Sequence, residues 1–158
     1  RWMHRRSAVP GTRRAAARRQ WQAGGNMVAF SDAFTGFSVS DIAVAKSFYA
    51  DTLGMTVSDG EMGMLHLVLP SGQRVLVYPK PDHEPASFTI LNLVVEDIEG
   101  AVDDLNARGV VTKIYGDESG TDEKGIQRQW GPPIAWFRDP AGNVLSVIAG
   151  DATEQSGE

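Results

Sequence analysis

The chain has 158 residues, of which 42% are apolar, and it contains three histidines and no cysteine. This length is enough for one hydrophobic core, and the lack of cysteine excludes disulfides, thiol catalysis, cysteine zinc sites and iron–sulfur clusters. The longest apolar runs are far shorter than the roughly 20 residues that a membrane helix requires. We therefore expect a cytoplasmic protein with no membrane partner.

The net charge of −5 is unevenly distributed along the chain. Residues 1–27 hold seven of the 15 basic residues, all arginines, and no acidic residue, so that residues 28–158 have a balance of −12. We expect this acidic domain not to bind nucleic acid. The basic leader could be a nucleic-acid arm, a membrane arm or a targeting peptide. Because Met27 resembles an ordinary start, we expect residues 1–27 to be disordered or not part of the native protein.

Residues 30–82 follow the order strand, helix, strand, strand, strand. A strand predicted at 34–39 leads to Asp41, which can cap a helix, and apolar residues then recur at helical spacing from Ile42 to Leu53. Gly54 ends this helix. Further strands are predicted at 55–57, 62–69 and 74–78, and the last two are joined by a turn at 70–73.

Residues 86–149 repeat this order. A strand at 90–95 precedes the capping residue Asp97, a helix face runs from Ile98 to Leu105, and strands are predicted at 110–115, 134–138 and 144–148. Residues 116–133 show no periodicity and are predicted to form a long loop, a kind of segment that often carries function. The sequence thus predicts one domain over 28–150, built from modules at about 30–82 and 86–149, and an acidic tail at 151–158.

The duplicated βαβββ plan resembles that of the vicinal oxygen chelate superfamily, which includes glyoxalase I, extradiol dioxygenases, fosfomycin-resistance enzymes and bleomycin-binding proteins. The motifs that carry the resemblance are Val39-Ser40-Asp41-Ile42 with Leu53-Gly54, and the run WFRDPAGNVL at 136–145. The resemblance covers about 30–149 and implies an α+β fold whose curved mixed sheets surround a cup. It also implies a homodimer, and it leaves open whether the cup is formed within one chain or between two.

In metal-dependent members of that superfamily, His, Gln or Glu side chains bind a divalent metal at four repeat-related strand positions. Counting from the helix caps and from the turn of the second repeat places these positions at Phe34, Leu76, Ile90 and Ser146. The first three have no donor atom, and a serine hydroxyl is a poor ligand for a divalent cation. We therefore expect neither a metal site nor any other cofactor.

Residues two apart on a strand share a face, so the neighbours of these four positions extend the predicted lining of the cup. We expect the ligand-binding residues to be Phe34, Ser38, Leu76, Tyr78, Ile90, Asn92, Trp136 and Ser146. Such a lining is apolar with a few polar groups, and it suits a flat or aromatic small molecule.

The predicted function is the binding of a small organic ligand without turnover, as in bleomycin-binding proteins. One alternative is an enzyme of the same fold, a lyase, isomerase or dioxygenase, that uses a metal or acid/base groups such as His66, Tyr78 or Glu96. Another is an interaction module whose cup is filled by its own side chains. The identity of the ligand and the occurrence of turnover do not follow from the residues.

Overall fold

The computed structural model describes residues 28–150, so the predictions for residues 1–27 and 151–158 lie outside the described residues. From Thr35 onward the described chain forms one compact unit, which is the subject of the sections below. Among residues 28–150, no helix is long and apolar enough to cross a membrane.

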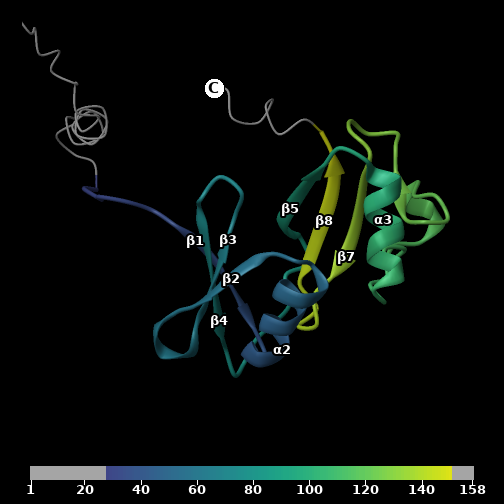
Figure 1. Cartoon of the computed structure of the whole chain (residues 1–158). Helices are drawn as coiled ribbons and strands as arrows, with labels where there is room; N and C mark the ends of the chain where they lie inside the picture. The colour runs from purple at the N-terminus through teal and green to yellow at the C-terminus, as the bar shows by residue number, and fades with distance from the viewer. Residues whose placement is uncertain (1–27, 151–158) are drawn as a thin grey trace, which may run out of the picture. The chain divides into compact units, whose positions relative to one another are not determined.

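The first module forms a four-stranded sheet with one helix (Figure 1). Its elements are β1 (Thr35–Val39), α2 (Ile42–Ser47), the π-helical turn η1 (Phe48–Thr52), β2 (Thr56–Asp59), the 3-10 turn η2 (Glu61–Gly63), β3 (Leu65–Val68) and β4 (Arg74–Pro79). The strand order is β1-β4-β3-β2. β1 and β4 are parallel, and the other two pairs are antiparallel.

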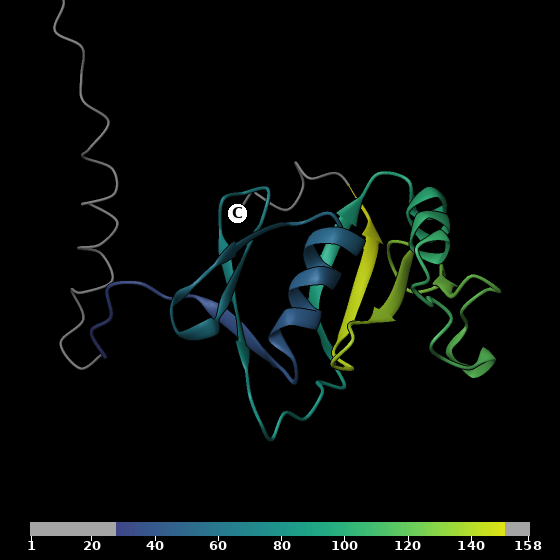
Figure 2. The same ribbon diagram turned by 60° about the horizontal axis from the view of Figure 1, so that its bottom comes forward.

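The second module repeats this topology. It consists of β5 (Thr89–Val95), α3 (Ile98–Ala107), the 3-10 turn η3 (Asp117–Ser119), β6 (Ile126–Gln127), β7 (Ile134–Arg138) and β8 (Val144–Ala149). The order is β5-β8-β7-β6, again with one parallel pair. Figures 1 and 2 show α3 beside the sheet that contains β7 and β8. The predicted α+β fold with two βαβββ repeats is confirmed.

Both helices begin at the residues that the sequence predicts, whereas α2 ends at Ser47 and the predicted helix continues to Thr52 as the π-helical turn η1. The Asp41 carboxylate accepts hydrogen bonds from the backbone N–H groups of Ala43 and Val44, at 3.0 and 3.1 Å. The Asp97 carboxylate accepts one from Gly100 N, at 3.1 Å. Gly54 and Gly109 follow the two helices with φ of 69° and 82°, a left-handed conformation that costs glycine little.

One face of each sheet packs into a hydrophobic core that the two modules share. Alternate residues of the strands point into this core, as the period of two requires. The buried members include Leu65, Leu67, Val75 and Val77 from the first sheet and Ala135, Phe137, Leu145 and Val147 from the second. The opposite face of each sheet, here called the open face, carries the residues in between.

The strand predicted at 110–115 is wrong. These residues belong to no strand, and the edge of the second sheet is formed by β6, inside the predicted loop. Burial explains why β6 and not 110–115 forms this edge, because β6 places Ile126 and Gln127 in the interior with exposed fractions of 1% and 5%. The 110–115 segment is held instead by the buried hydroxyl of Thr112, which donates to Lys124 O at 2.7 Å.

Several strand boundaries also differ from the prediction, and the starts of β1 and β3 differ in a way that bears on the site. β1 begins at Thr35, so Phe34 precedes the strand, and its side chain is 77% exposed. β3 begins at Leu65 rather than at Met62, because Met62 lies in η2 with a φ of 57° that no strand residue adopts.

Candidate functional site

The open face of the first sheet carries a row of four residues from four strands. Cross-strand pairing aligns Gly36 with Leu76, Leu76 with His66, and His66 with Ser58. Tyr78 lies two residues along β4 from Leu76 and so shares this face. The structure therefore places two of the predicted site residues, Leu76 and Tyr78, on one surface together with His66.

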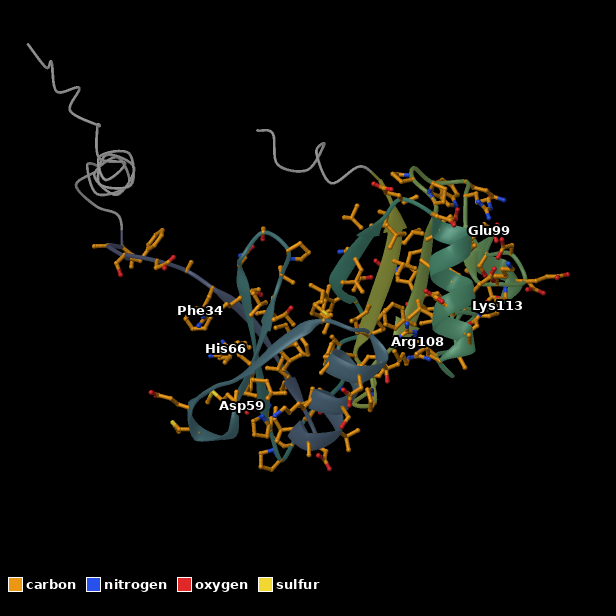
Figure 3. The ribbon with its side chains drawn as sticks, viewed as in Figure 1. Phe34, Asp59, His66, Glu99, Arg108 and Lys113 are labelled. Carbon is orange, nitrogen blue, oxygen red and sulfur yellow. The ribbon has the colours of Figure 1, made fainter. Side chains whose placement is uncertain are left out.

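A hollow of about 750 Å³ opens beside this row. It is lined by residues from 58 to 76, all of the first module, and Figure 3 labels two of them, His66 and Asp59. Arg74 also lines it and has no ion pair among the described residues. The sequence predicts Leu76 in the cup but does not predict the hollow, because most of its other walls come from the end of β2 and from the η2 turn, where the sequence has no recognisable motif.

The η2 turn is fitted closely around the His66 ring. A Cβ atom added at Gly60 would lie 3.0 Å from His66 Nε2, closer than side chains normally approach. Met62, also in the lining, has a left-handed backbone and is 86% exposed. Non-glycine residues in this conformation cost about 1–2 kcal/mol and are concentrated at binding and catalytic sites.

The open face of the second sheet brings together three other predicted site residues. Ser146, which is fully buried, donates a hydrogen bond of 2.6 Å from Oγ to Asn92 Oδ1, and Trp136 lies across the sheet from Ser146. The Trp136 indole N–H donates to Thr89 Oγ1 at 3.1 Å, and its ring meets that of Tyr115 edge to face at 5.5 Å. These contacts fix the plane of an aromatic surface beside a polar pair.

The placement of Ile90 on this face is wrong. β5 contains a register shift between Thr89 and Leu91, so that one extra residue interrupts the pairing with β8. The bulge moves Ile90 against the hydrophobic core and leaves Thr89 on the same face as Asn92. No glycine or proline marks the bulge, and counting by twos from the helix cap therefore gives the wrong residue.

Ser38 lies on β1, opposite Tyr78, but its hydroxyl is occupied. His83 Nε2 lies 3.0 Å from the carbonyl oxygen of Ala141, which can only accept, so this nitrogen carries a proton. In the neutral ring, His83 Nδ1 then accepts from Ser38 Oγ at 2.7 Å. His83 thus links the first strand to the turn between β7 and β8, and we assign it a structural role.

A buried pair joins η1 to the same turn. Tyr49 and Asp139 are 0% and 4% exposed, and the Tyr49 hydroxyl donates to Asp139 Oδ2 at 2.7 Å. Burial, together with the negative charge of Asp139 and this hydrogen bond, raises the pKa of Tyr49 above its ordinary value of 10.0. Asp139 also accepts from the backbone and side-chain nitrogens of Asn143, at 2.8 and 3.0 Å. The pair holds the two modules together.

The residues at the four family metal positions do not fit a metal. Phe34, Leu76 and Ile90 have no donor atom, and the hydroxyl of Ser146 is already bonded to Asn92. Within residues 28–150, no group of three or more His, Asp or Glu side chains is placed to hold a metal ion. His66 is the one histidine among the residues that line the hollow of the first sheet.

Comparison with known families agrees with the topology and the motifs. The family model of the Glyoxalase/Bleomycin resistance protein/Dioxygenase superfamily matches residues 33–147. The chain belongs to this superfamily. The match spans both modules, from the residues before β1 to the middle of β8.

Three proteins illustrate how similar this chain is to others in sequence and structure. The uncharacterized protein YraH of Bacillus subtilis is 24% identical over 123 residues, 69% of this chain and 90% of YraH. A solved superfamily structure from Sphaerobacter thermophilus is 26% identical with a TM-score of 0.55, over 75% of this chain and 98% of that one. TnmS3, an antibiotic binding protein from Streptomyces sp. CB03234, is 25% identical with a TM-score of 0.56, over 79% of this chain and all of TnmS3.

Proposed function

We propose that this protein binds a small, flat organic ligand in the cup of the glyoxalase-like fold, in the cytoplasm, without a metal and without turnover. The chemistry of the four family metal positions carries this proposal. Phe34 and Leu76 have no donor atom, the Ile90 side chain packs against the core, and the Ser146 hydroxyl is already bonded, so these residues do not form a divalent metal site. Leu76, on the open face, suits an apolar ligand instead.

The two open faces offer complementary contacts to such a ligand. Trp136 presents an aromatic surface whose N–H is already bonded to Thr89. Asn92 is exposed, its oxygen accepts from Ser146, and its amide N–H groups have no partner among residues 28–150 and can donate to a ligand. On the first sheet, Leu76 and Arg74 line the hollow. Stacking, together with one or two directed hydrogen bonds, is the usual pattern of a small-molecule pocket.

The relative TnmS3 supports the choice of binding over catalysis, since it is described as an antibiotic binding protein and aligns with this chain over its whole length. Binding proteins of this kind need shape and a few polar anchors rather than a reactive group.

A homodimer is part of the same proposal. The hollow beside Leu76 is lined by first-module residues alone, and no hydrogen bond among the described residues joins it to the Asn92, Ser146 and Trp136 group. Val94, on the open face of the second sheet, is 37% exposed. We propose that a second copy covers these faces, so that each cup combines the first sheet of one chain with the second sheet of the other. Sedimentation at the mass of one chain would contradict this arrangement.

The proposal is tested with flat, uncharged aromatic probes, for example a naphthalene diol with adjacent hydroxyls, titrated into the full chain in the presence of EDTA. We expect saturable binding with one probe per cup, and loss of binding in Leu76→Arg. Val44→Arg is the matched control, because Val44 is a half-exposed residue of α2 outside the open faces. Equal binding by both variants, or no binding of any probe, would contradict the proposal.

An acid/base enzyme of the same fold is the second candidate, and the position of His66 in the hollow favours it. In that case an α-ketoaldehyde adduct or an acyl-CoA would be converted, and His66→Gln would abolish turnover while leaving probe binding intact. Probe binding without conversion of either substrate favours the binding protein.

A further inference from the structure

A second hollow, of about 650 Å³, has none of the predicted ligand-binding residues in its lining. Its walls come from η1, from the segment that follows α3, and from the end of β7, and none of its lining residues lines the hollow beside His66. Three of the lining residues are basic, Arg108, Lys113 and Arg138, and Figure 3 labels the first two on the second module. Apolar walls are formed by Phe48, Val110 and Ile114.

The charge pattern around this hollow is unusual for so acidic a domain. Residues 28–158 have eight basic side chains against 20 acidic ones. Five of the eight pair with an acid, and among the described residues Arg74, Arg108 and Arg138 do not. Two of these three arginines line this one hollow. Although the domain has more acidic than basic side chains, the guanidinium groups of Arg108 and Arg138 form no ion pair among the described residues. Their positive charge is therefore available to a ligand.

Other contacts hold two of the three basic groups in place. Arg108 Nη1 donates to Thr52 O at 3.1 Å, which uses one of the five N–H donors of its guanidinium. Lys113 Nζ is held by Thr121 Oγ1 at 2.7 Å, and its ion pair is with Asp117, a fully exposed carboxylate that solvent screens. The Arg138 side chain has no hydrogen bond within residues 28–150 and is free to move onto a ligand.

One acid, Asp139, also lines the hollow, and its oxygens are occupied. They accept from Tyr49 Oη and from two nitrogens of Asn143, at 2.7 to 3.0 Å. Asp139 therefore forms no ion pair with the arginines, and three cations outnumber one buried carboxylate.

We propose that this hollow binds a small organic oxyanion, a phosphate or carboxylate group attached to an apolar body, at a site separate from the cup. The planar fork of arginine matches the oxygens of both groups, and charge-assisted hydrogen bonds of this kind are the strong ones. The walls formed by Phe48, Val110 and Ile114 would cover the apolar part, and the volume is that of a small-molecule pocket.

The test titrates the full chain with phenyl phosphate, benzoate and uncharged phenol at constant ionic strength, with calorimetry as the readout. We expect saturable binding of phenyl phosphate or benzoate. The probe that binds more tightly shows whether the site prefers a phosphate or a carboxylate group. Phenol should not bind. Arg138→Gln should weaken the anion by about tenfold or more, because a hydrogen bond to a charged group is lost.

Arg128→Gln is the matched control, since it removes the same charge from an exposed ion pair with Glu99 outside the hollow. We expect it to bind the anion like the wild type. Arg138→Lys, which keeps the charge but not the fork, should fall between wild type and Arg138→Gln. The proposal is overturned if Arg138→Gln binds normally, if both glutamine variants lose the same affinity, or if phenol binds as well as the anions. Arg138 is exposed, so the melting temperature should not change in either of its variants.

Discussion

Replacing Tyr49 with phenylalanine tests the pair that joins the two modules. The substitution removes one hydrogen bond of 2.7 Å to a carboxylate that is 4% exposed, and it keeps the ring, whose neighbours Phe37 and Phe48 lie at 5.8 and 5.3 Å. A hydrogen bond to a charged group contributes about 1.5–3 kcal/mol. Because Asp139 retains its two bonds from Asn143, we expect a loss within that range rather than unfolding.

The same pair predicts a dependence of stability on alkaline pH. The pKa of Tyr49 is raised in the folded state above its ordinary value of 10.0. A group whose pKa is raised on folding contributes its full stability below the unfolded pKa and loses it as the pH rises further. Above about pH 10 the wild-type free energy of unfolding should therefore fall by up to roughly 1.4 kcal/mol per pH unit relative to Tyr49→Phe.

Urea denaturation of both proteins at neutral pH and above pH 10 measures the two effects. Tyr78→Phe is the control, because Tyr78 is half-buried and has no hydrogen bond from its hydroxyl among the described residues. A loss below 0.5 kcal/mol in Tyr49→Phe, or an equal loss in Tyr78→Phe, would refute the role of the pair.

Three further variants test the second module. Gly125→Ala should lower the free energy of unfolding by well over 2 kcal/mol, since the added Cβ would lie 2.1 Å from Thr112 O. Gly131→Ala is its control. Gly131 has a similar φ of 82°, but its Cβ would have no atom within 4 Å, so this variant should lose about 1 kcal/mol. Equal losses in thermal unfolding would contradict this packing. Ser146→Ala should lower stability by about 1 kcal/mol through loss of the bond to Asn92, and an unchanged midpoint would show that the bond contributes nothing.

The repeat and its boundaries could be predicted because local signals agree with the tertiary structure. Asp41 and Asp97 cap helices through side-chain contacts within a few residues, and the turns and the alternation of β4 and β8 are equally local. The strand predicted at 110–115 failed for the opposite reason. Its apolar residues resemble a strand, but the sheet edge is taken by Ile126, about a dozen residues later, which becomes buried there.

The candidate site was predictable only in part. Regular strand pairing brings together Asn92, Trp136 and Ser146, as the alternation of strand residues predicts. The bulge at Ile90 breaks this alternation by one residue, and no glycine or proline in the sequence indicates it. Phe34 was placed by counting along a strand that in fact begins one residue later.

The two hollows could not be predicted at all. Each depends on a turn or on a tertiary contact between segments that are distant in the sequence, such as the hydrogen bond from Arg108 to Thr52 O. No sequence motif predicts such a contact.

The measurement that tests the central claim most directly is the affinity of the full chain for the naphthalene diol, determined with EDTA and again with added zinc, nickel or manganese. Adjacent hydroxyls would chelate a metal held in the cup, so the probe responds to metal-dependent and metal-independent sites alike. We predict one dissociation constant under both conditions and loss of binding in Leu76→Arg. Binding that requires the metal, and that EDTA abolishes, would contradict the account.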